Sequence, residues 1–162
     1  MASIGRILNY NPPAERRIPS QVLATWENGI FLKKEDINRD IKGLRSPQIG
    51  AIYATLSHWE VSSDAATIVM PTGTGKTEVM LSLLIAASCY KTMIIVPTDA
   101  LRSQISNKVA SLGLLADPQF SIVKETVLKP IVGVMSHRPA SSEEAIAFME
   151  QCNAVSYTHL RA

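Results

Sequence analysis

The stretch Met70–Met80, "MPTGTGKTEVM", decides the fold, because its Gly-x-Gly-Lys-Thr core has the composition of a phosphate cradle. A bound phosphate needs backbone N–H groups that point inward, and glycine adopts the required conformations at low cost. Gly73 and Gly75 supply this freedom, and the positive N-terminus of a following helix would face the same anion. Lys76 would place a charge on the β- and γ-phosphates of a nucleotide, and Thr77 would offer its hydroxyl to Mg²⁺.

The sequence on both sides of this stretch fits a phosphate cradle. The generic pattern asks for a glycine six positions before the lysine, where Met70 stands in this chain. The run "TIVM" (Thr67–Met70) has no polar alternation after Thr67, which predicts a strand buried on both faces. Residues Lys76–Ser88 predict an apolar helix. The alternative is an ordinary glycine turn at the start of a helix.

Short β-branched runs and helical segments alternate along the rest of the chain. Ser46 as N-cap and Pro47 at the first helical position predict a helix that runs to about Trp59. Further helices are predicted over 20–28 with Ser20 as N-cap, 33–42 closed by Gly43, 99–112 ended by Gly113, and 141–152 with a Ser141–Glu144 capping box; further strands are predicted over 92–97, again buried on both faces, 120–125 and 130–135. Strands that alternate with helices predict an α/β fold with a mainly parallel sheet and helices on both faces.

Composition restricts the class of protein but not its partner. The chain has 162 residues, 46% of them hydrophobic, as expected for a globular domain. Its net charge of +2 is too close to zero to predict nucleic-acid binding from bulk electrostatics. Cys89 and Cys152 form no zinc or disulfide spacing, which predicts a reducing cytoplasm. The apolar run Val79–Tyr90 is too short to span a bilayer, so no membrane is expected as a partner.

The first 43 residues differ from the rest and are predicted to form a short helical extension. Residues 11–20 hold three prolines and two arginines and predict an irregular arm. This basic-leaning region could contact a partner or could be a solvated extension. Residues 44–154 would then form the main domain.

Two further motifs accompany the cradle: "LRSPQ" (Leu44–Gln48) and "VPTDALRSQ" (Val96–Gln104). With "PTGTGKT" they resemble the motifs of superfamily 2 DEAD/DEAH-like helicases and translocases, in particular the motor of type III restriction enzymes. The resemblance implies that residues 44–154 are an incomplete RecA-like P-loop NTPase domain that binds ATP and Mg²⁺. It implies DNA as the first choice of partner and RNA as the second. It also implies that activity requires a second RecA-like domain.

The same resemblance assigns roles to individual residues. It implies nucleotide contacts by Gln48, Pro71, Thr72, Gly73, Thr74, Gly75, Lys76, Thr77 and Glu78, with Lys76 and Thr77 as the catalytic residues and Thr77 as the Mg²⁺ ligand. Gln48 would contact adenine, although it could be a plain surface glutamine on a first helical turn. Contacts to the nucleic-acid backbone are implied for Pro97, Thr98, Arg102 and Gln104. The Thr98 hydroxyl and the helix start after it can grip a phosphate, although strand–helix turns commonly hold such residues.

Two features of the second half limit this interpretation. Superfamily 2 enzymes need an Asp-Glu pair to hold Mg²⁺ and activate water, and no such box follows Gln104. The pair Glu143–Glu144 opens a helix, so capping explains it better. The tail "VSYTHLRA" (Val155–Ala162) resembles a translation of the transposon-end adapter used in sequencing libraries. We therefore expect this tail to be non-native, with no roles for Tyr157, His159 or Arg161, and the parent protein to continue beyond Ala154.

The sequence thus predicts the N-terminal, ATP-binding part of a nucleic-acid-dependent ATPase that couples hydrolysis to movement on DNA or RNA. By itself this fragment is expected to be deficient in hydrolysis. The alternatives are a P-loop kinase for a small substrate and a nucleotide-binding switch that does not hydrolyse ATP.

Overall fold

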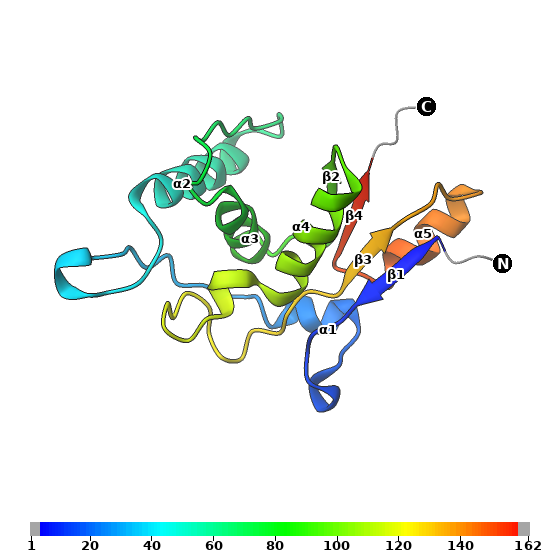
Figure 1. Ribbon diagram of the computed structural model, residues 1–162, viewed down its shortest axis with the longest axis horizontal. Helices are drawn as coiled ribbons and strands as arrows, with labels where there is room; N and C mark the ends of the chain where they lie inside the picture. The colour runs from blue at the N-terminus through cyan, green and yellow to red at the C-terminus, as the bar shows by residue number, and fades with distance from the viewer. Residues whose placement is uncertain (1–3, 159–162) are drawn as a thin grey trace.

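The structure is a computed structural model that describes residues 4–158, and its strands and helices alternate along most of the chain (Figure 1). The strands are β1 (Gly5–Leu8), β2 (Thr92–Val96), β3 (Val132–Met135) and β4 (Ala154–Thr158). The α-helices are α1 (Pro19–Ala24), α2 (Ser46–Val61), α3 (Lys76–Ala86), α4 (Asp99–Ser111) and α5 (Ser142–Glu150). Three short 3₁₀ turns are η1 (Pro13–Glu15), η2 (Ile37–Arg39) and η3 (Gly113–Ala116).

The four strands form one sheet in the order β1-β3-β4-β2. Ala154 of β4 lies opposite Thr92 of β2 and Val132 of β3, and both of these pairings are parallel. Strand β1 pairs antiparallel with β3 at the edge, with Gly5 opposite Met135. The predicted α/β fold with a mainly parallel sheet is confirmed, and it is consistent with an incomplete RecA-like domain.

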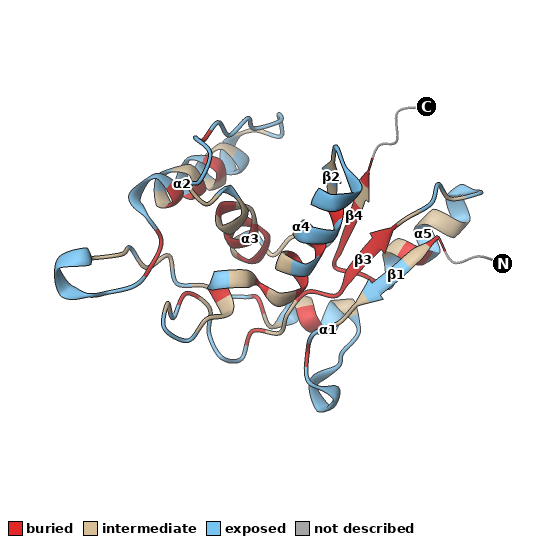
Figure 2. Ribbon diagram, in the orientation of Figure 1, coloured by how far each residue is buried: buried red, intermediate tan, exposed pale blue. Residues whose placement is uncertain are grey.

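Helices cover both faces of this sheet, as predicted. On one face α4 packs over β4, where the Ser106 and Ser156 hydroxyl oxygens lie 2.6 Å apart. On the other face α5 packs on β3 so closely that a Cβ atom on Gly133 would lie 2.7 Å from the Phe148 ring and 2.8 Å from the Cys152 sulfur. Figure 2 shows β3 and β4 buried between these layers. Gly133 is therefore required by the close approach of α5.

Helix α3 lies in the core beside α2 and α4 (Figure 1). Its buried residues are Val79, Leu81, Ser82, Leu83, Leu84 and Ile85, which follow one another around the helix. A helix that is apolar on nearly all sides must be enclosed by neighbouring elements. The predicted helix over 76–88 is confirmed with an end two residues earlier, and Gly75 is its N-cap.

The strand predicted over Thr67–Met70 is wrong. Ile68 is 41% and Val69 is 88% exposed, and an apolar cavity of about 250 Å³ is lined by both Ile68 and Ile94 of β2. A strand needs the N–H and C=O groups of a neighbour, and none of the strands in residues 4–158 pairs with this segment. The segment therefore runs as irregular chain although its residue types favour a strand.

Strand β2 confirms the predicted location but not the predicted burial. It pairs with β4 on one side and is the last strand in the sheet order. Met93 is 49% and Ile95 is 64% exposed, whereas the intervening Ile94 packs against the core. Burial on both faces is thus wrong for this strand, because no helix within residues 4–158 covers the outer face at Met93 and Ile95.

The helix predicted over 33–42 is also wrong, because residues 33–44 form a hairpin, called here the 33–44 hairpin. Asp36 and Ile41 exchange two backbone hydrogen bonds of 2.9 Å, which defines an antiparallel pair. The Asp36 carboxylate accepts from the N–H of Asn38, and Asp40 takes a left-handed φ of 52°. Aspartate side chains stabilise turns in this way at the expense of helix, so only η2 is helical.

Smaller differences concern caps and short strands. Ile18 and Arg45, rather than Ser20 and Ser46, are the N-cap residues of α1 and α2. The segment 120–125 forms only an isolated bridge, between Val123 and Ile30, instead of a strand. Strand β1 was not predicted, and it joins the N-terminal region to the sheet. Ser141 does cap α5, since its hydroxyl accepts from the Glu144 N–H.

Strand β4 lies in the centre of the sheet and includes Val155–Thr158, the start of the adapter-like tail. Valine, tyrosine and threonine favour strands whatever their origin, so this pairing leaves the adapter interpretation a prediction. His159 and Arg161 lie outside the described residues. Tyr157 is half-buried in β4 beside the α5 layer.

Candidate nucleotide-binding site

The loop before α3 has the backbone shape of a phosphate cradle. Gly73 and Gly75 have φ values of 79° and 83°, and Gly75 is the N-cap of α3. These left-handed conformations are the ones that glycine adopts at low cost. A Cβ atom built on Gly73 meets no atom within 4 Å, so open space lies above this residue. The first turn of α3 adds N–H groups without intrahelical acceptors, which suit an anion.

Two side chains of the loop bind back to its own carbonyl groups. The Lys76 ammonium donates to the Pro71 carbonyl oxygen at 2.9 Å, and the Thr74 hydroxyl donates to the same oxygen at 2.6 Å. Lys76 is exposed, so its side chain can reorient toward a phosphate without unpacking the core. Thr74 therefore holds the shape of the loop rather than facing the ligand.

The first turn of α2 grips the same loop through what we call the Arg45–Gln48 clamp. The Arg45 guanidinium donates to the Gly73 carbonyl at 3.1 Å, and the Gln48 amide nitrogen donates to the Gly75 carbonyl at 3.1 Å. The Gln48 amide oxygen accepts from the Arg45 backbone N–H at 2.8 Å. Gln48 is only 5% exposed, so the alternative of a plain surface glutamine is wrong.

Arg45 is the residue that the sequence reasoning missed. It is the second residue of "LRSPQ", but it contacts a backbone carbonyl. Every residue type has this carbonyl, so the identity of the contacted residue gives no signal in the sequence. The clamp uses one N–H and one lone pair of the Gln48 amide, and one of each is left over. The predicted adenine contact of Gln48 stays a prediction, and the structure adds a second task for this side chain.

A cavity of about 900 Å³ opens beside the cradle. Among the predicted nucleotide residues, Gln48, Thr72, Gly73, Gly75, Lys76, Thr77 and Glu78 line it, whereas Pro71 and Thr74 do not. Its other walls come from the 33–44 hairpin, from α4 and from residues 114–122. The volume lies within the range of roughly 300–1,000 Å³ that is typical of small-molecule sites. The residues present therefore fit a nucleotide.

The residues also fit Mg²⁺ that arrives with the nucleotide. Within residues 4–158 no group of three or more His, Cys, Asp and Glu side chains could hold a metal ion by itself. Mg²⁺ in phosphate-transfer sites keeps several waters and needs only one or two protein ligands besides the phosphates. Thr77 and Glu78 both line the cavity beside the cradle and are the candidates for that role.

The predicted nucleic-acid contacts are separated by the fold. Pro97 and Thr98 are exposed where β2 ends, and the Thr98 hydroxyl accepts from the Leu101 N–H at 3.3 Å as the N-cap of α4. Gln104 is exposed on α4 and lines the cavity beside the cradle. The four residues thus face at least two different regions, which the spacing in "VPTDALRSQ" does not reveal.

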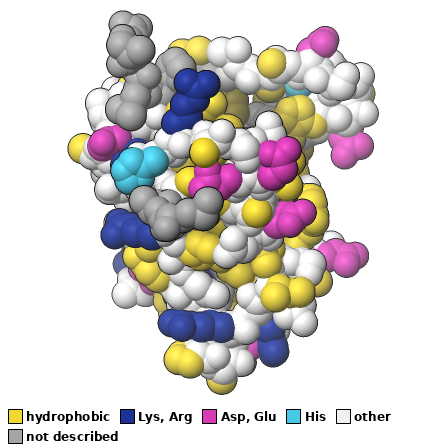
Figure 3. All heavy atoms as spheres, turned by 90° about the vertical axis from the view of Figure 1, so that its right-hand side faces the viewer, with side chains coloured by type: hydrophobic (Ala, Val, Ile, Leu, Met, Phe, Trp, Pro, Cys, Tyr) yellow, Lys and Arg dark blue, Asp and Glu magenta, His cyan; other side chains and the backbone are white. Residues whose placement is uncertain are grey.

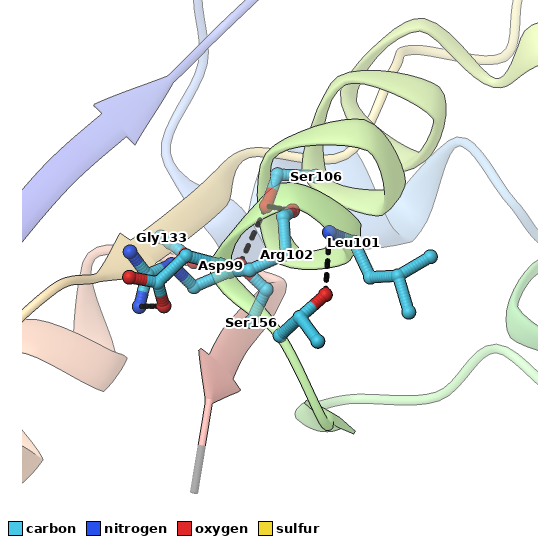
Figure 4. Close-up of polar contacts among 7 residues, drawn as sticks. Asp99, Leu101, Arg102, Ser106, Gly133 and Ser156 are labelled. Atoms are coloured by element: carbon cyan, nitrogen blue, oxygen red, sulfur yellow. Dashed lines mark hydrogen bonds and ion pairs between the residues drawn. The ribbon is translucent and has the colours of Figure 1, made fainter. Parts of the chain in front are cut away.

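Arg102 is directed inward. It is 9% exposed, and its guanidinium lies 3.0 Å from the Asp99 carboxylate. Figure 4 shows this pair at the start of α4, with Ser106 one turn further along and directed at Ser156 of β4. The Arg102 Nε atom is buried and has no hydrogen-bond partner within the described residues. A buried, paired guanidinium is poorly placed to contact a phosphate backbone.

Neither the face shown in Figure 3 nor the two cysteines add a second site. On the end of the molecule shown in Figure 3, acidic and basic side chains both occur among hydrophobic ones, so this face carries no field of one sign. Burial raises the pKa of the Cys152 thiol to about 11, with the Lys91 charge acting in the opposite direction. Burial likewise raises the pKa of Cys89, and both thiols are free. A raised pKa favours the protonated thiol, which is a weaker nucleophile than the thiolate.

A phosphate cradle at the start of a buried helix, beside a mainly parallel sheet, defines a P-loop nucleotide-binding domain. The family described as type III restriction enzyme, res subunit, matches residues 41–149. The chain belongs to this family, whose domain is helicase-like and binds ATP. No curated protein and no solved structure matches the chain. Within residues 4–158 no helix combines the length and apolar character needed to cross a membrane.

Proposed function

We propose that this chain is the ATP-binding part of a nucleic-acid-dependent ATPase, a helicase or translocase that couples hydrolysis to movement on DNA or RNA. The observation that carries the proposal is the cradle at Gly73 and Gly75, which opens into a nucleotide-sized cavity in a member of this family. The family also favours a motor over a P-loop kinase for a small substrate, because kinases of that kind have no need of the second motif after β2.

Each residue of the cradle has a separate task in this proposal. The backbone N–H groups of Gly73 and Gly75 hold the phosphates, and Lys76 turns from the Pro71 carbonyl toward the β- and γ-phosphates. Thr77 would ligate Mg²⁺ through its hydroxyl. When bound, Mg²⁺ would neutralise charge on the phosphates. These groups bind and orient the nucleotide, and hydrolysis requires further groups.

Hydrolysis and movement are proposed for a larger assembly. A water-activating carboxylate and a second RecA-like domain are needed, and the chain shows no Asp-Glu box after Gln104. We therefore propose that the chain alone binds ATP without turning it over. DNA is the first choice of partner, contacted through the exposed Pro97 and Thr98 at the end of β2.

The binding step is tested by calorimetric titration of Mg-ATP into the chain and its Lys76→Ala variant. We expect the substitution to weaken ATP at least ten-fold, because the charge on the phosphates is lost. Arg16→Ala, which removes an exposed arginine of the N-terminal arm outside the cavity, is the matched control and should bind as the parent does. Unchanged affinity in Lys76→Ala, with the parent fold shown by circular dichroism, would refute the proposal.

A further inference from the structure

Strand β2 is the last strand in the sheet order, and the backbone groups on its outer edge have no partner strand. The Thr92 N–H donates to the Asn153 carbonyl at 3.1 Å, in the direction of β4. The backbone groups of successive residues in a strand point alternately to its two edges. The N–H and C=O groups of Met93 and Ile95 therefore point away from β4, and no strand within residues 4–158 pairs with them.

This edge lacks the features that normally keep an open edge from pairing. Proteins protect such edges with charged side chains, proline or a bulge. The segment Thr92–Val96 has neither charge nor proline, and its register with β4 is continuous. Lys91 directly precedes the strand, but its ammonium donates to the Met149 and Cys152 carbonyls of its own chain. The outer edge of β2 is therefore open to another strand.

Apolar surface on both faces of β2 restricts which strand can join it. On the uncovered face, Met93 is 49% and Ile95 is 64% exposed. On the other face, Ile94 and side chains of α3 that include Met80 and Leu84 line the apolar cavity of about 250 Å³. Burying a charge against such surface is costly. A strand added at this edge must therefore carry apolar side chains on both of its faces.

Strand β2 itself meets this requirement. In an antiparallel pair of two β2 strands with a twofold axis at Ile94, Met93 lies opposite Ile95 of the second copy. These residues have outward backbone groups, so each opposite pair would exchange two hydrogen bonds. The two Ile94 side chains meet at the axis on the side of the cavities, and no like charges within β2 face each other. A twofold contact of this kind closes at two copies.

We propose that the chain forms a twofold dimer through its β2 edges, which joins the two sheets into one. The partner is a second copy of this chain, because the edge is complementary to itself in hydrogen bonds, in apolar character and in its lack of charge. The dimer does not depend on the nucleotide site, so the proposed function stands or fails separately.

The first test measures the mass of the chain by sedimentation velocity over a range of concentrations. We expect the parent to dimerise reversibly and Ile95→Pro to weaken dimerisation at least ten-fold. The proline removes an outward N–H and spares the bonds between β2 and β4, as edge strands tolerate. Ile95→Ala keeps that N–H and is the matched control, which should dimerise more tightly than the proline variant. A monomeric parent, open-ended assemblies, or equal dimerisation of the two variants would overturn the proposal.

A second test locates the axis and does not require the proline variant to fold. Ile94→Cys brings the two introduced thiols together at the axis, whereas Thr92→Cys lies opposite Val96 of the second copy. Oxidised glutathione, which accepts the electrons of the two thiols, should link at least five-fold more covalent dimer in Ile94→Cys. Both variants retain Cys89 and Cys152, so linkage through these residues is common to both. Equal linkage in the two variants, or none in Ile94→Cys, would overturn the proposal.

Discussion

The starts of α3 and α4 were both expected to face phosphates, but they are built differently. Gly75, the N-cap of α3, has no side chain and a φ of 83°, and open space lies above Gly73. Thr98, the N-cap of α4, satisfies the Leu101 N–H with its own hydroxyl, and Arg102 in the next turn is buried against Asp99. One helix start is open to an anion and the other is closed by its own residues.

This difference concerns two properties of a helix start, its dipole and its unsatisfied N–H groups, which the sequence motifs do not distinguish. The helix dipole is present at both starts and favours an anion at each. What differs is whether local side chains already satisfy the free N–H groups, as Thr98 does at α4. A helix N-terminus is therefore available to a ligand only where the sequence leaves it without a cap. The glycines of "PTGTGKT" provide this at α3.

The largest effect is expected from a substitution that adds a side chain at the open start of α3. In Gly75→Ala, the new Cβ would lie 2.1 Å from the Gln48 amide nitrogen, and the residue would keep a left-handed φ. Backbone strain of about 1–2 kcal/mol and a broken buried hydrogen bond of about 1–3 kcal/mol should lower the free energy of unfolding by roughly 2–5 kcal/mol. Urea denaturation measures the loss, and calorimetry should show ATP binding abolished.

Gly73→Ala is the matched control for this substitution. Its φ is similar, but its Cβ would meet no atom within 4 Å, so only the strain of about 1–2 kcal/mol remains. Its methyl group would occupy the open space where a phosphate should lie, so ATP binding should still be lost. Equal destabilisation by the two alanines would contradict the packing of Gln48 against Gly75.

A smaller effect is expected from the clamp that joins α2 to the open start. Gln48→Ala removes the acceptor of the Arg45 N–H and the donor to the Gly75 carbonyl. Loss of these buried partners should cost about 1–3 kcal/mol of unfolding free energy. Because the clamp positions the loop, the affinities for Mg-ATP and Mg-tripolyphosphate should fall by the same factor. A loss confined to ATP would show that Gln48 acts on the base alone.

A substitution at the closed start of α4 should change the stability of the protein rather than its ligand binding. Arg102→Ala removes a buried stem and its ion pair with the exposed Asp99, which should cost about 1–2 kcal/mol, mainly from lost packing. Binding to single-stranded DNA, measured by fluorescence anisotropy over a series of salt concentrations, should keep its slope. A slope reduced by about one charge would show that Arg102 contacts a phosphate in the complex.

Residue patterns predicted the helices and the cradle better than they predicted the strands. Helix α3 and the glycines before it depend on neighbours in the chain, so the sequence carries their signal directly. Strands depend on a partner elsewhere, and "TIVM" has the residue types of a strand without a neighbour in the sheet. Strand β4 is the opposite case. Most of its residues lie in the tail that was expected to be non-native, from Val155 onward, and yet it pairs with a strand on each side.

The candidate site also has a part that the sequence predicts and a part that it does not. The cradle and the position of Gln48 beside it follow from motifs, because glycine geometry and helix starts are local. The role of Arg45 could not be read from the sequence, since it acts through a backbone carbonyl. The pattern "KKEDINRDIKG" has helical composition, and the turn is decided by the Asp36 side chain and by cross-strand bonds that composition does not show.

The smallest effect is expected at α5, a third helix start that is closed like that of α4. A hydrogen bond from its own backbone N–H, and then one from Ser141, lower the pKa of Glu143 below its usual 4.5. A lowered pKa in the folded state stabilises the protein above about pH 4.5, and this stabilisation is lost as the pH falls through the folded-state value. Glu143→Gln should therefore lower the urea midpoint slightly at pH 7, and this difference from the parent should shrink as the pH is lowered below 4.5. A difference that stays constant with pH would show that the carboxylate charge has no part in closing this helix start.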